Sequence, residues 1–427
     1  KWGYSADTSS TAQYVTNVTN PPAAGNTNGG IIDFGDDSNW STGSAADGIN
    51  LFVTNTLAVN ITSEFNTGWM NGDIKLATLS DTDDTDVTGS KLVTGDAASD
   101  DTNSIGSWVN SGMSVLESST NFTNGSTYAL HFTADGNGDD VYVSFPTVIG
   151  KTYTISFDAY ATNYSGSSTL GTFIGTTITG SQYTSTYATV TSASTWTKYT
   201  ATFTATTTTA YLTFIEGGSN NNIDAYIDNL SVRIAEEDRS VKNKGLQVFG
   251  TITKDPVATG ADLVAYSGFS ASNYLQQPYN SDLDFGTGDF CIMGWVKEAA
   301  SSDWLIDRME GRDGSSNLWG FDIWQQAQSL RFDVYENNGA TSVTSTTAMG
   351  SDDGVWNFFT AVRRSGVLEM YMHGKLAGTT SGTARNISYT STGNPPPLTI
   401  GVKNTGASAW LNGSAALIRI SATAPTA

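Results

Sequence analysis

Apolar and polar residues alternate most clearly between residues 356 and 378. Trp356, Phe358, Thr360 and Val362 occupy every second position, and the alternation resumes at 368, 370 and 372 after a polar break at 364–366. A period of two on both sides of a short turn that contains Gly predicts a β-hairpin. A hairpin this long and apolar is not stable alone in water. We therefore expect it to form the middle of a sheet that packs on a second sheet.

Short apolar segments separated by turn residues continue along the rest of the chain. After residue 263 they lie at 274–275, 290–296, 304–307, 319–324, 330–334, 398–402 and 416–420. Earlier in the chain they lie at 128–132, 141–145, 153–159, 196–203, 210–215 and 225–232. Evenly spaced short strands with turn signals between them are typical of β-sandwiches. We therefore predict two sandwiches, at 91–234 and 263–427.

The remaining parts of the chain show weaker patterns. Residues 1–90 contain strand candidates at 30–34, 49–53, 57–61 and 69–77, and we interpret them as an N-terminal β-rich segment for attachment and assembly. Residues 235–262 form a charged connector with one short strand. We find no convincing helical periodicity. The predicted fold class is all-β, with tandem β-sandwiches behind an N-terminal β-rich segment.

The net charge of −21 narrows the choice of partners. Residues 1–232 hold 5 Lys and Arg against 22 Asp and Glu, whereas residues 233–427 hold 15 against 19. So few cations cannot neutralise a phosphate backbone, which argues against nucleic acid. No apolar run approaches the roughly 20 residues of a spanning helix, so we expect no membrane insertion. The acidity favours solubility, with cation binding as the alternative.

Three segments of the 91–234 region carry a family pattern. They are GKTYTISFDA at 150–159, WTKY at 196–199 and IDNLSV at 227–232. Together they resemble the family 4/9 carbohydrate-binding modules, which are jelly rolls of the galactose-binding-like type. In that family the aspartate matching Asp228 commonly helps to hold a structural Ca²⁺. The resemblance thus implies Asp228 as a metal ligand; the alternative is a capped terminal strand without metal.

The segments after residue 263 carry a second and stronger pattern. In order they read GDFCIMGWVK, WLIDR, GFDIW, LRFDVY, WNFFTAVRRSGVLEMYMHGKLAG, LTIG and AALIRIS. This order is similar to a laminin-G or pentraxin-type domain, within the concanavalin A-like lectin/glucanase sandwiches. His373 stands where that family usually has Asn before the turn Gly, so polar contacts of the family at this turn are not carried over.

Three stretches at the junctions resemble tail-fibre-like proteins of aquatic bacteriophages. They are NTGWMNGDIKLATLSDTDDTDVTG at 66–89, the region from DRSVKNKGLQVFG to GTGDF at 238–290, and LIRISATAPTA at 417–427. The resemblance implies a subunit of a virion fibre on the virion surface. Its partners would be host-surface glycans, other copies of the chain and other virion proteins. Because the chain opens on Lys1 without a Met, we expect a processed chain or a piece of a longer polypeptide.

The sequence lacks the usual catalytic patterns. Glucanases on the concanavalin A-like fold need two glutamates and an aspartate alternating on one strand, and no such triplet occurs. The nearest acidic cluster, Asp307-Arg308-Met309-Glu310, has a different spacing. Of the two histidines, His131 lies in an apolar run, where we interpret it as a satisfied strand residue. We therefore expect a non-enzymatic protein.

Aromatic residues are the best candidates for a binding site. The chain has 11 Trp and 18 Tyr, and aromatic faces stack on the C–H surfaces of sugars while amides and carboxylates bind the hydroxyls. Trp319, Trp324 and Trp410 are the predicted exposed contacts, with a place in the core or a subunit interface left open. Trp295 and Trp356 have apolar neighbours at strand spacing, so we expect them in the core.

These observations favour a structural phage appendage subunit with lectin-like domains for host glycans. Two alternatives remain open. A secreted cellular adhesin or filament protein could use the nine Asn-x-Ser/Thr triplets as glycosylation acceptors. A polysaccharide depolymerase is the minor alternative.

Overall fold

The structure is a computed structural model in which the chain forms two compact units, residues 1–71 and 72–427. In the first unit it describes only β1 (Ser5–Ala6), which pairs with β2 (Gln13–Tyr14). The described residues of the second unit are 73–78, 82–93, 105–120, 126–134, 136, 138–163, 169–184, 196–217, 223–298, 303–310, 318–346, 354–382, 384–389, 395–403 and 409–425. The strand candidates at 30–34, 49–53 and 57–61 lie outside the described residues.

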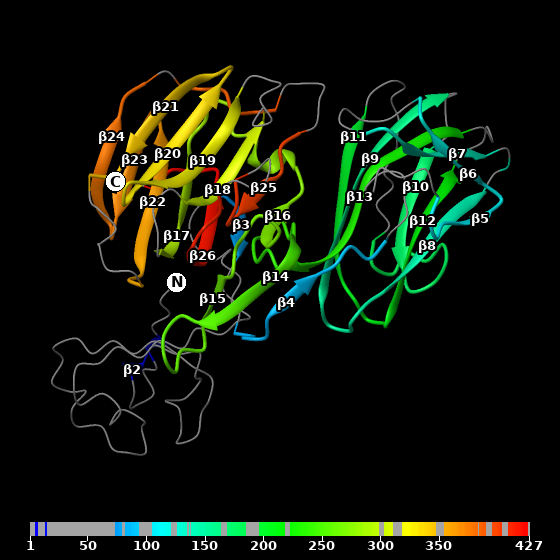
Figure 1. The fold of residues 1–427 in the computed structure, drawn as a ribbon, viewed down its shortest axis with the longest axis horizontal. Coiled ribbons are helices and arrows are strands. Elements are labelled where there is room, and N and C mark those ends of the chain that lie inside the picture. Colours follow the sequence, from blue (N-terminus) through cyan, green and yellow to red (C-terminus); the bar gives the residue numbers. More distant parts are fainter. Residues whose placement is uncertain are drawn as a thin grey trace, which may run out of the picture. The chain divides into compact units, whose positions relative to one another are not determined.

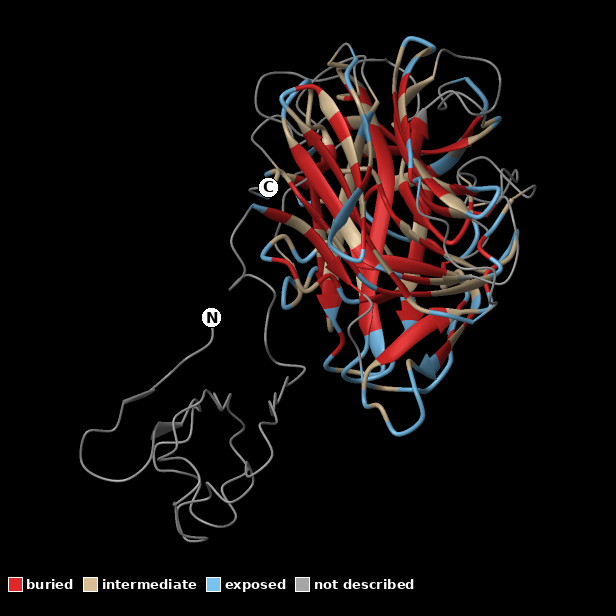
Figure 2. Cartoon of the chain, turned by 90° about the vertical axis from the view of Figure 1, so that its left-hand side faces the viewer, coloured by how far each residue is buried: buried red, intermediate tan, exposed pale blue. Residues whose placement is uncertain are grey.

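The predicted all-β class is confirmed. Within the described part of the chain, the regular elements are strands apart from one 3-10 turn at Ser281–Leu283. In these same residues, no helix has the length and apolar character needed to cross a membrane. The second unit contains two sandwiches, each with its own buried apolar cluster between its sheets (Figures 1 and 2).

The first sandwich, drawn mainly in cyan to green in Figure 1, consists of two antiparallel sheets. One sheet has the order β10 (Thr169–Gly175), β12 (Thr209–Gly217), β8 (Asp140–Pro146), β5 (Val109–Ser111). The other has the order β11 (Thr197–Thr204), β9 (Thr152–Asn163), β13 (Ile223–Glu236), β7 (Ala129–Ala134), β6 (Ser114–Ser118). Phe132, Phe157 and Phe214 meet between these sheets in the core.

The second sandwich contains the predicted central hairpin. One sheet has the order β24 (Lys375–Thr380), β23 (Val367–Met372), β22 (Asn357–Arg364), β17 (Phe290–Glu298), β26 (Gly413–Ser421), β3 (Ile74–Thr78). The other has the order β21 (Gly339–Thr344), β20 (Ser329–Glu336), β19 (Trp319–Gln326), β18 (Trp304–Glu310), β25 (Leu398–Ile400), β16 (Tyr274–Gln277), β14 (Leu246–Pro256). Short strands β4 (Val87–Gly89) and β15 (Val264–Ser267) also pair with β14.

The hairpin forms as predicted, and positions 368, 370 and 372 of β23 face the core together with the odd-numbered positions of β22. Phe359 and Ala361 point into the core, whereas Trp356 is half-buried and its Nε1–H donates to the Val257 carbonyl at 2.9 Å. The expectation that Trp295 is buried is wrong, because 36% of its surface is exposed. The core-facing positions of β17 are even-numbered, such as Ile292, so Trp295 lies on the outer side of the sheet.

Charged side chains also lie inside the second sandwich. Arg363 is 1% exposed, and its guanidinium donates to the carbonyls of Gly288 at 2.6 Å, Arg385 at 2.7 Å and Gly286 at 2.8 Å. Through these hydrogen bonds Arg363 connects β22 to the loops that contain Gly288 and Arg385. Arg308, equally buried, forms an ion pair with Asp284.

Candidate functional site

Four aromatic rings form a continuous row on the outer side of the sheet β11–β9–β13–β7–β6. On β9 the core takes Ile155, Phe157 and Ala159, so Tyr160 faces outward. The strand register then places Tyr160 opposite Tyr226 of β13, and Tyr226 opposite His131 of β7. Trp196 precedes β11 and completes the row at the edge of the sheet. We call these four residues, His131, Tyr226, Tyr160 and Trp196, the aromatic row.

The rings of the aromatic row are in contact from one end to the other. His131 and Tyr226 stack with centroids 4.3 Å apart and planes 2° apart. Tyr226 lies 5.9 Å from Tyr160 at 60°, and Tyr160 stacks on Trp196 at 5.2 Å and 28°. His131, Tyr160 and Trp196 are half-buried, and Tyr226 is buried. Because neighbouring strands are about 4.8 Å apart, the row spans roughly 14 Å across the sheet, which is enough for more than one pyranose ring.

Polar side chains stand beside the aromatic row and hold one another in place. The Nε2 atom of His131 forms a hydrogen bond with Asp224. Asp158 lies two residues before Tyr160 on β9. Its carboxylate accepts hydrogen bonds from Lys198 Nζ and Asn229 Nδ2, both at 2.9 Å. Aromatic side chains next to fixed hydrogen-bonding groups are the residue types that contact the C–H surfaces and the hydroxyls of a sugar.

Asp228, the predicted metal ligand, is fully buried beside this face. Its Oδ1 accepts hydrogen bonds from the Asn229 N–H at 2.6 Å and the Ser126 hydroxyl at 3.3 Å. Asn229 takes a left-handed conformation with φ of 52°, where the pairing of β13 with β9 is interrupted. No group of three or more His, Cys, Asp or Glu that could hold a metal occurs within the described ranges. Calcium at Asp228 stays a prediction from the resemblance.

Trp324, a predicted sugar contact, lies on the outer side of the second sandwich as part of a stacked pair. Its ring lies 4.9 Å from that of Trp304 with planes 5° apart. Its Nε1–H donates to Asp333 Oδ2 at 2.8 Å, and the Arg331 guanidinium lies over its ring at 5.4 Å. The Lys403 ammonium lies 5.1 Å from the Trp304 ring centroid. Both faces of this tryptophan pair therefore have a neighbouring cation.

The structure does not bring the other two predicted tryptophans into one site with Trp324. Trp319 begins β19 and has the odd parity of the core-facing Phe321, so it lies on the other side of the sheet. At about 3.3 Å per residue, it is also some 17 Å from Trp324 along the strand. Trp410 is 38% exposed, and its backbone pairs with Val402. Trp410 is the most exposed of the three predicted contacts.

A row of three aspartates also emerges from the strand register. Asp307, Asp322 and Asp333 lie directly opposite one another on β18, β19 and β20, and each is at most 2% exposed. Sequence reasoning noted Asp307 only within its own strand. The glucanase arrangement alternates along one strand, whereas this row runs across three, so it is a different constellation.

Sequence reasoning missed the aromatic row, although one signal was present. Tyr160 follows Ser156 and Asp158 at every second position, and this outward parity is visible in the sequence. The interpretation of His131 as a satisfied strand residue is consistent with its stacking and its bond to Asp224. What no sequence pattern supplied was the register that places β7, β13 and β9 side by side.

Comparisons with known proteins give one family match. Residues 269–427 match the family model of the concanavalin A-like lectin/glucanases superfamily. No curated protein matches the chain. Among solved structures, the chain is similar to the botulinum neurotoxin serotype D binding domain, with 12% identity, coverage of 45% of this chain and 46% of that one, and a TM-score of 0.34.

Two further structures extend the comparison. One is the CBM40 of Ruminococcus gnavus IT-sialidase, with 12% identity, coverage of 33% and 80%, and a TM-score of 0.29. The other is the CBM22-1–CBM22-2 tandem domain of Paenibacillus barcinonensis Xyn10C, with 11% identity, coverage of 79% and 98%, and a TM-score of 0.29. The chain spans under half the length of the neurotoxin domain. The C-terminal part of this chain is a concanavalin A-like sandwich.

Proposed function

We propose that this protein is a non-enzymatic, glycan-binding structural subunit of a phage virion fibre or appendage. The observation that carries the glycan-binding part is the aromatic row, where four contacting rings lie along the outer side of one sheet with fixed polar groups beside them. The concanavalin A-like match of residues 269–427 supports a lectin-like role for the second sandwich. The virion setting is supported by the tail-fibre resemblance.

The aromatic row would hold a sugar chain through its half-buried rings. Trp196 is the best residue to change because it ends the row, is half-buried and precedes β11. We expect Trp196→Ala to weaken binding to a neutral oligosaccharide chosen by glycan array at least tenfold, about 1.4 kcal/mol. Isothermal titration measures this effect, with Trp410→Ala as the control that removes a tryptophan from the other sandwich.

A result in which both variants bind like the wild type would remove the aromatic row from the proposal.

Weak contacts of one site need repetition to hold a cell surface, so we propose that copies of the chain assemble. The proposed assembly segment is residues 1–90, of which residues 1–71 form a separate compact unit. Light scattering should show that the chain without residues 1–71 is monomeric while the full chain is not.

Purified virions test whether this chain is a virion protein. Mass spectrometry of purified virions should find this chain, and its absence from particles would favour the secreted adhesin. An intact mass above the sequence mass by hexose-sized steps would favour that alternative as well. A depolymerase would release reducing ends from host polysaccharide, and we expect no such release.

A further inference from the structure

A pocket of about 350 Å³ lies where the first sandwich continues into the second. There the end of β13 pairs with β14, Ala235 opposite Gln247. The Gln247 side-chain amide donates to the Thr154 carbonyl at 3.0 Å and to the Ser231 carbonyl at 3.3 Å. The walls of the pocket are therefore tied together by backbone pairing and by a buried side chain. We call this the junction pocket.

The charged groups of the junction pocket already interact within the protein. Lys198 Nζ lies 2.9 Å from the Asp158 carboxylate. Arg233 Nη1 donates to the Gly89 carbonyl at 2.8 Å, and Lys91 also has an interaction within the protein. None of the 13 lining residues is acidic. The neutral groups of the lining therefore decide which ligand the pocket suits.

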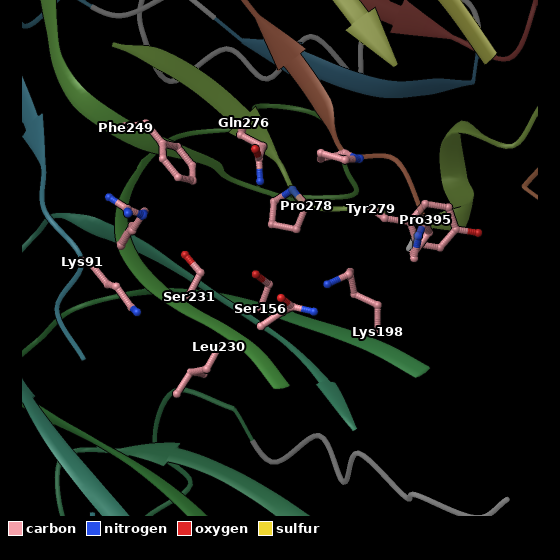
Figure 3. Close-up of a pocket in the computed structure, with 13 residues that line it drawn as sticks. Lys91, Ser156, Lys198, Leu230, Ser231, Phe249, Gln276, Pro278, Tyr279 and Pro395 are labelled. Carbon is pink, nitrogen blue, oxygen red and sulfur yellow. The ribbon is translucent and has the colours of Figure 1, made fainter. Parts of the chain in front are cut away.

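Two neutral polar side chains of the lining have no partner in the protein. Ser156 of β9 is 5% exposed, and Gln276 of β16 is half-buried. Among the described residues, neither the Ser156 hydroxyl nor the Gln276 side-chain amide hydrogen-bonds to a protein group. Figure 3 shows Ser156 and Gln276 on opposite sides of the pocket. Because a hydroxyl and an amide both donate and accept, the pair suits a ligand that presents hydroxyl groups.

Prolines supply the apolar part of the lining. Pro278 directly follows β16, and Pro395 and Pro397 precede β25. A rigid apolar wall with a few placed polar groups is typical of sites for small organic ligands, and this volume is at the small end of their range. A pyranose ring combines C–H surface with hydroxyls and is uncharged. The junction pocket therefore matches one neutral sugar residue.

The junction pocket continues the face that carries the aromatic row. Tyr160, Asp158 and Ser156 are successive outward positions of β9, and Ser156 lines the pocket. At about 3.3 Å per residue, Ser156 lies roughly 13 Å from Tyr160 along the strand. We propose that the junction pocket binds one neutral hexopyranose residue of the same glycan that contacts the aromatic row, an inference that rests on the proposed function. Recognition then requires a minimum chain length, because adjacent sugar rings do not span this separation.

The test compares a disaccharide with a hexasaccharide of one neutral glycan, selected by glycan array, in calorimetric titrations of the full chain. We expect the wild type to bind the hexasaccharide at least tenfold more tightly. Gln276→Ala should weaken hexasaccharide binding about fivefold and Ser156→Ala about threefold, because each removes one neutral hydrogen bond. Disaccharide binding should not change, since a disaccharide reaches only the aromatic row. Gln328→Ala, in the exposed turn after β19, is the matched control and should bind both sugars like the wild type.

Three results would overturn the inference. The first is equal affinity of the wild type for the two lengths, and the second is unchanged hexasaccharide binding in both pocket variants. The third is a loss of the same size for the disaccharide and the hexasaccharide, which would mean that the variants disturb the sheet and not the pocket.

Failure of the pocket is separable from failure of the proposed function. If Trp196→Ala weakens binding of both lengths while Gln276→Ala and Ser156→Ala weaken neither, the aromatic row stands and the junction pocket does not. If Trp196→Ala has no effect and the two pocket variants lose hexasaccharide binding, the junction pocket stands and the role of the aromatic row fails.

Discussion

The outer faces of the two sandwiches use aromatic and charged side chains differently. In the first sandwich the aromatic row contains three half-buried rings, and polar groups such as Lys198 and Asn229 lie beside it. In the second sandwich the comparable face has Trp324 bonded to Asp333 and covered by Arg331, next to buried aspartates. An aromatic residue on a sheet therefore indicates a ligand site only where its polar partners leave a face accessible.

The same contrast applies to charged residues. In the second sandwich, Arg363 and Arg308 bond to loop carbonyls and to Asp284 inside the domain, so they serve its stability. In the first sandwich, Lys198 lines a pocket. We therefore expect substitutions in the second sandwich to change mainly the free energy of unfolding, and substitutions on the outer face of the first to change mainly binding.

Replacing Arg363 should have the largest effect on stability. Burial lowers the pKa of Arg363 to about 10, so it is charged at neutral pH, and Arg363→Met removes a buried guanidinium together with its hydrogen bonds to the Gly288 and Arg385 carbonyls. We expect the free energy of unfolding to fall by about 3–5 kcal/mol. Chemical denaturation measures it, with Lys375→Met as the exposed control in the same sandwich. A loss below about 1 kcal/mol would mean that water replaces the guanidinium.

Bound calcium would stabilise only the first sandwich and so separate the melting behaviour of the two sandwiches. If Asp228 helps to hold the ion together with main-chain carbonyls and water, saturating Ca²⁺ adds about 2.7 kcal/mol at a hundredfold excess over the dissociation constant. We expect EDTA to lower the melting temperature of residues 91–234 and to leave that of 263–427 unchanged. Asp228→Asn should remove the EDTA effect, whereas Asp262→Asn, at an exposed position, should keep it. An EDTA-insensitive wild type contradicts the calcium prediction.

Replacing Asp333 tests whether the tryptophan pair contributes to the stability of the second sandwich. Asp333→Ala removes the acceptor of Trp324 Nε1 and the partner of Arg331 Nε, which lies 2.7 Å from Asp333 Oδ1. We expect a loss of about 1–3 kcal/mol in unfolding free energy. A double-mutant cycle with Trp324→Phe should show a coupling of at least 0.5 kcal/mol. Additive effects would instead indicate that Trp324 is independent of Asp333 and available to a ligand.

Trp410 should give the smallest effect. It is 38% exposed, and surface substitutions usually change the unfolding free energy by less than about 0.5 kcal/mol. We expect Trp410→Ala to melt like the wild type and to bind the neutral oligosaccharide within about threefold of it, since a tenfold change requires about 1.4 kcal/mol. A loss as large as that expected for Trp196→Ala would place the main glycan contact on the second sandwich.

The local pattern predicted much of the fold. The central hairpin, its turn at Ser365 and Gly366, and most strands of both sandwiches follow from alternation and turn residues. Both positions have positive φ, 49° and 83°, where Gly is favoured. The pattern was less informative about which side of each strand faces the core. It did not say which parity of β22 faces the core, and it placed Trp295 inside when 36% of it is exposed.

The sequence by itself determined the all-β class, the two sandwiches and the surplus of negative charge, because these depend on residue type and on spacing within one strand. The tertiary structure decided which strands are neighbours. Only that register places Tyr160 beside Tyr226 and His131, and aligns Asp307 with Asp322 and Asp333. It also brings Lys91, Lys198 and Arg233 to one pocket. Contacts between strands far apart in the chain depend on how two sheets pack, and no local spacing records that.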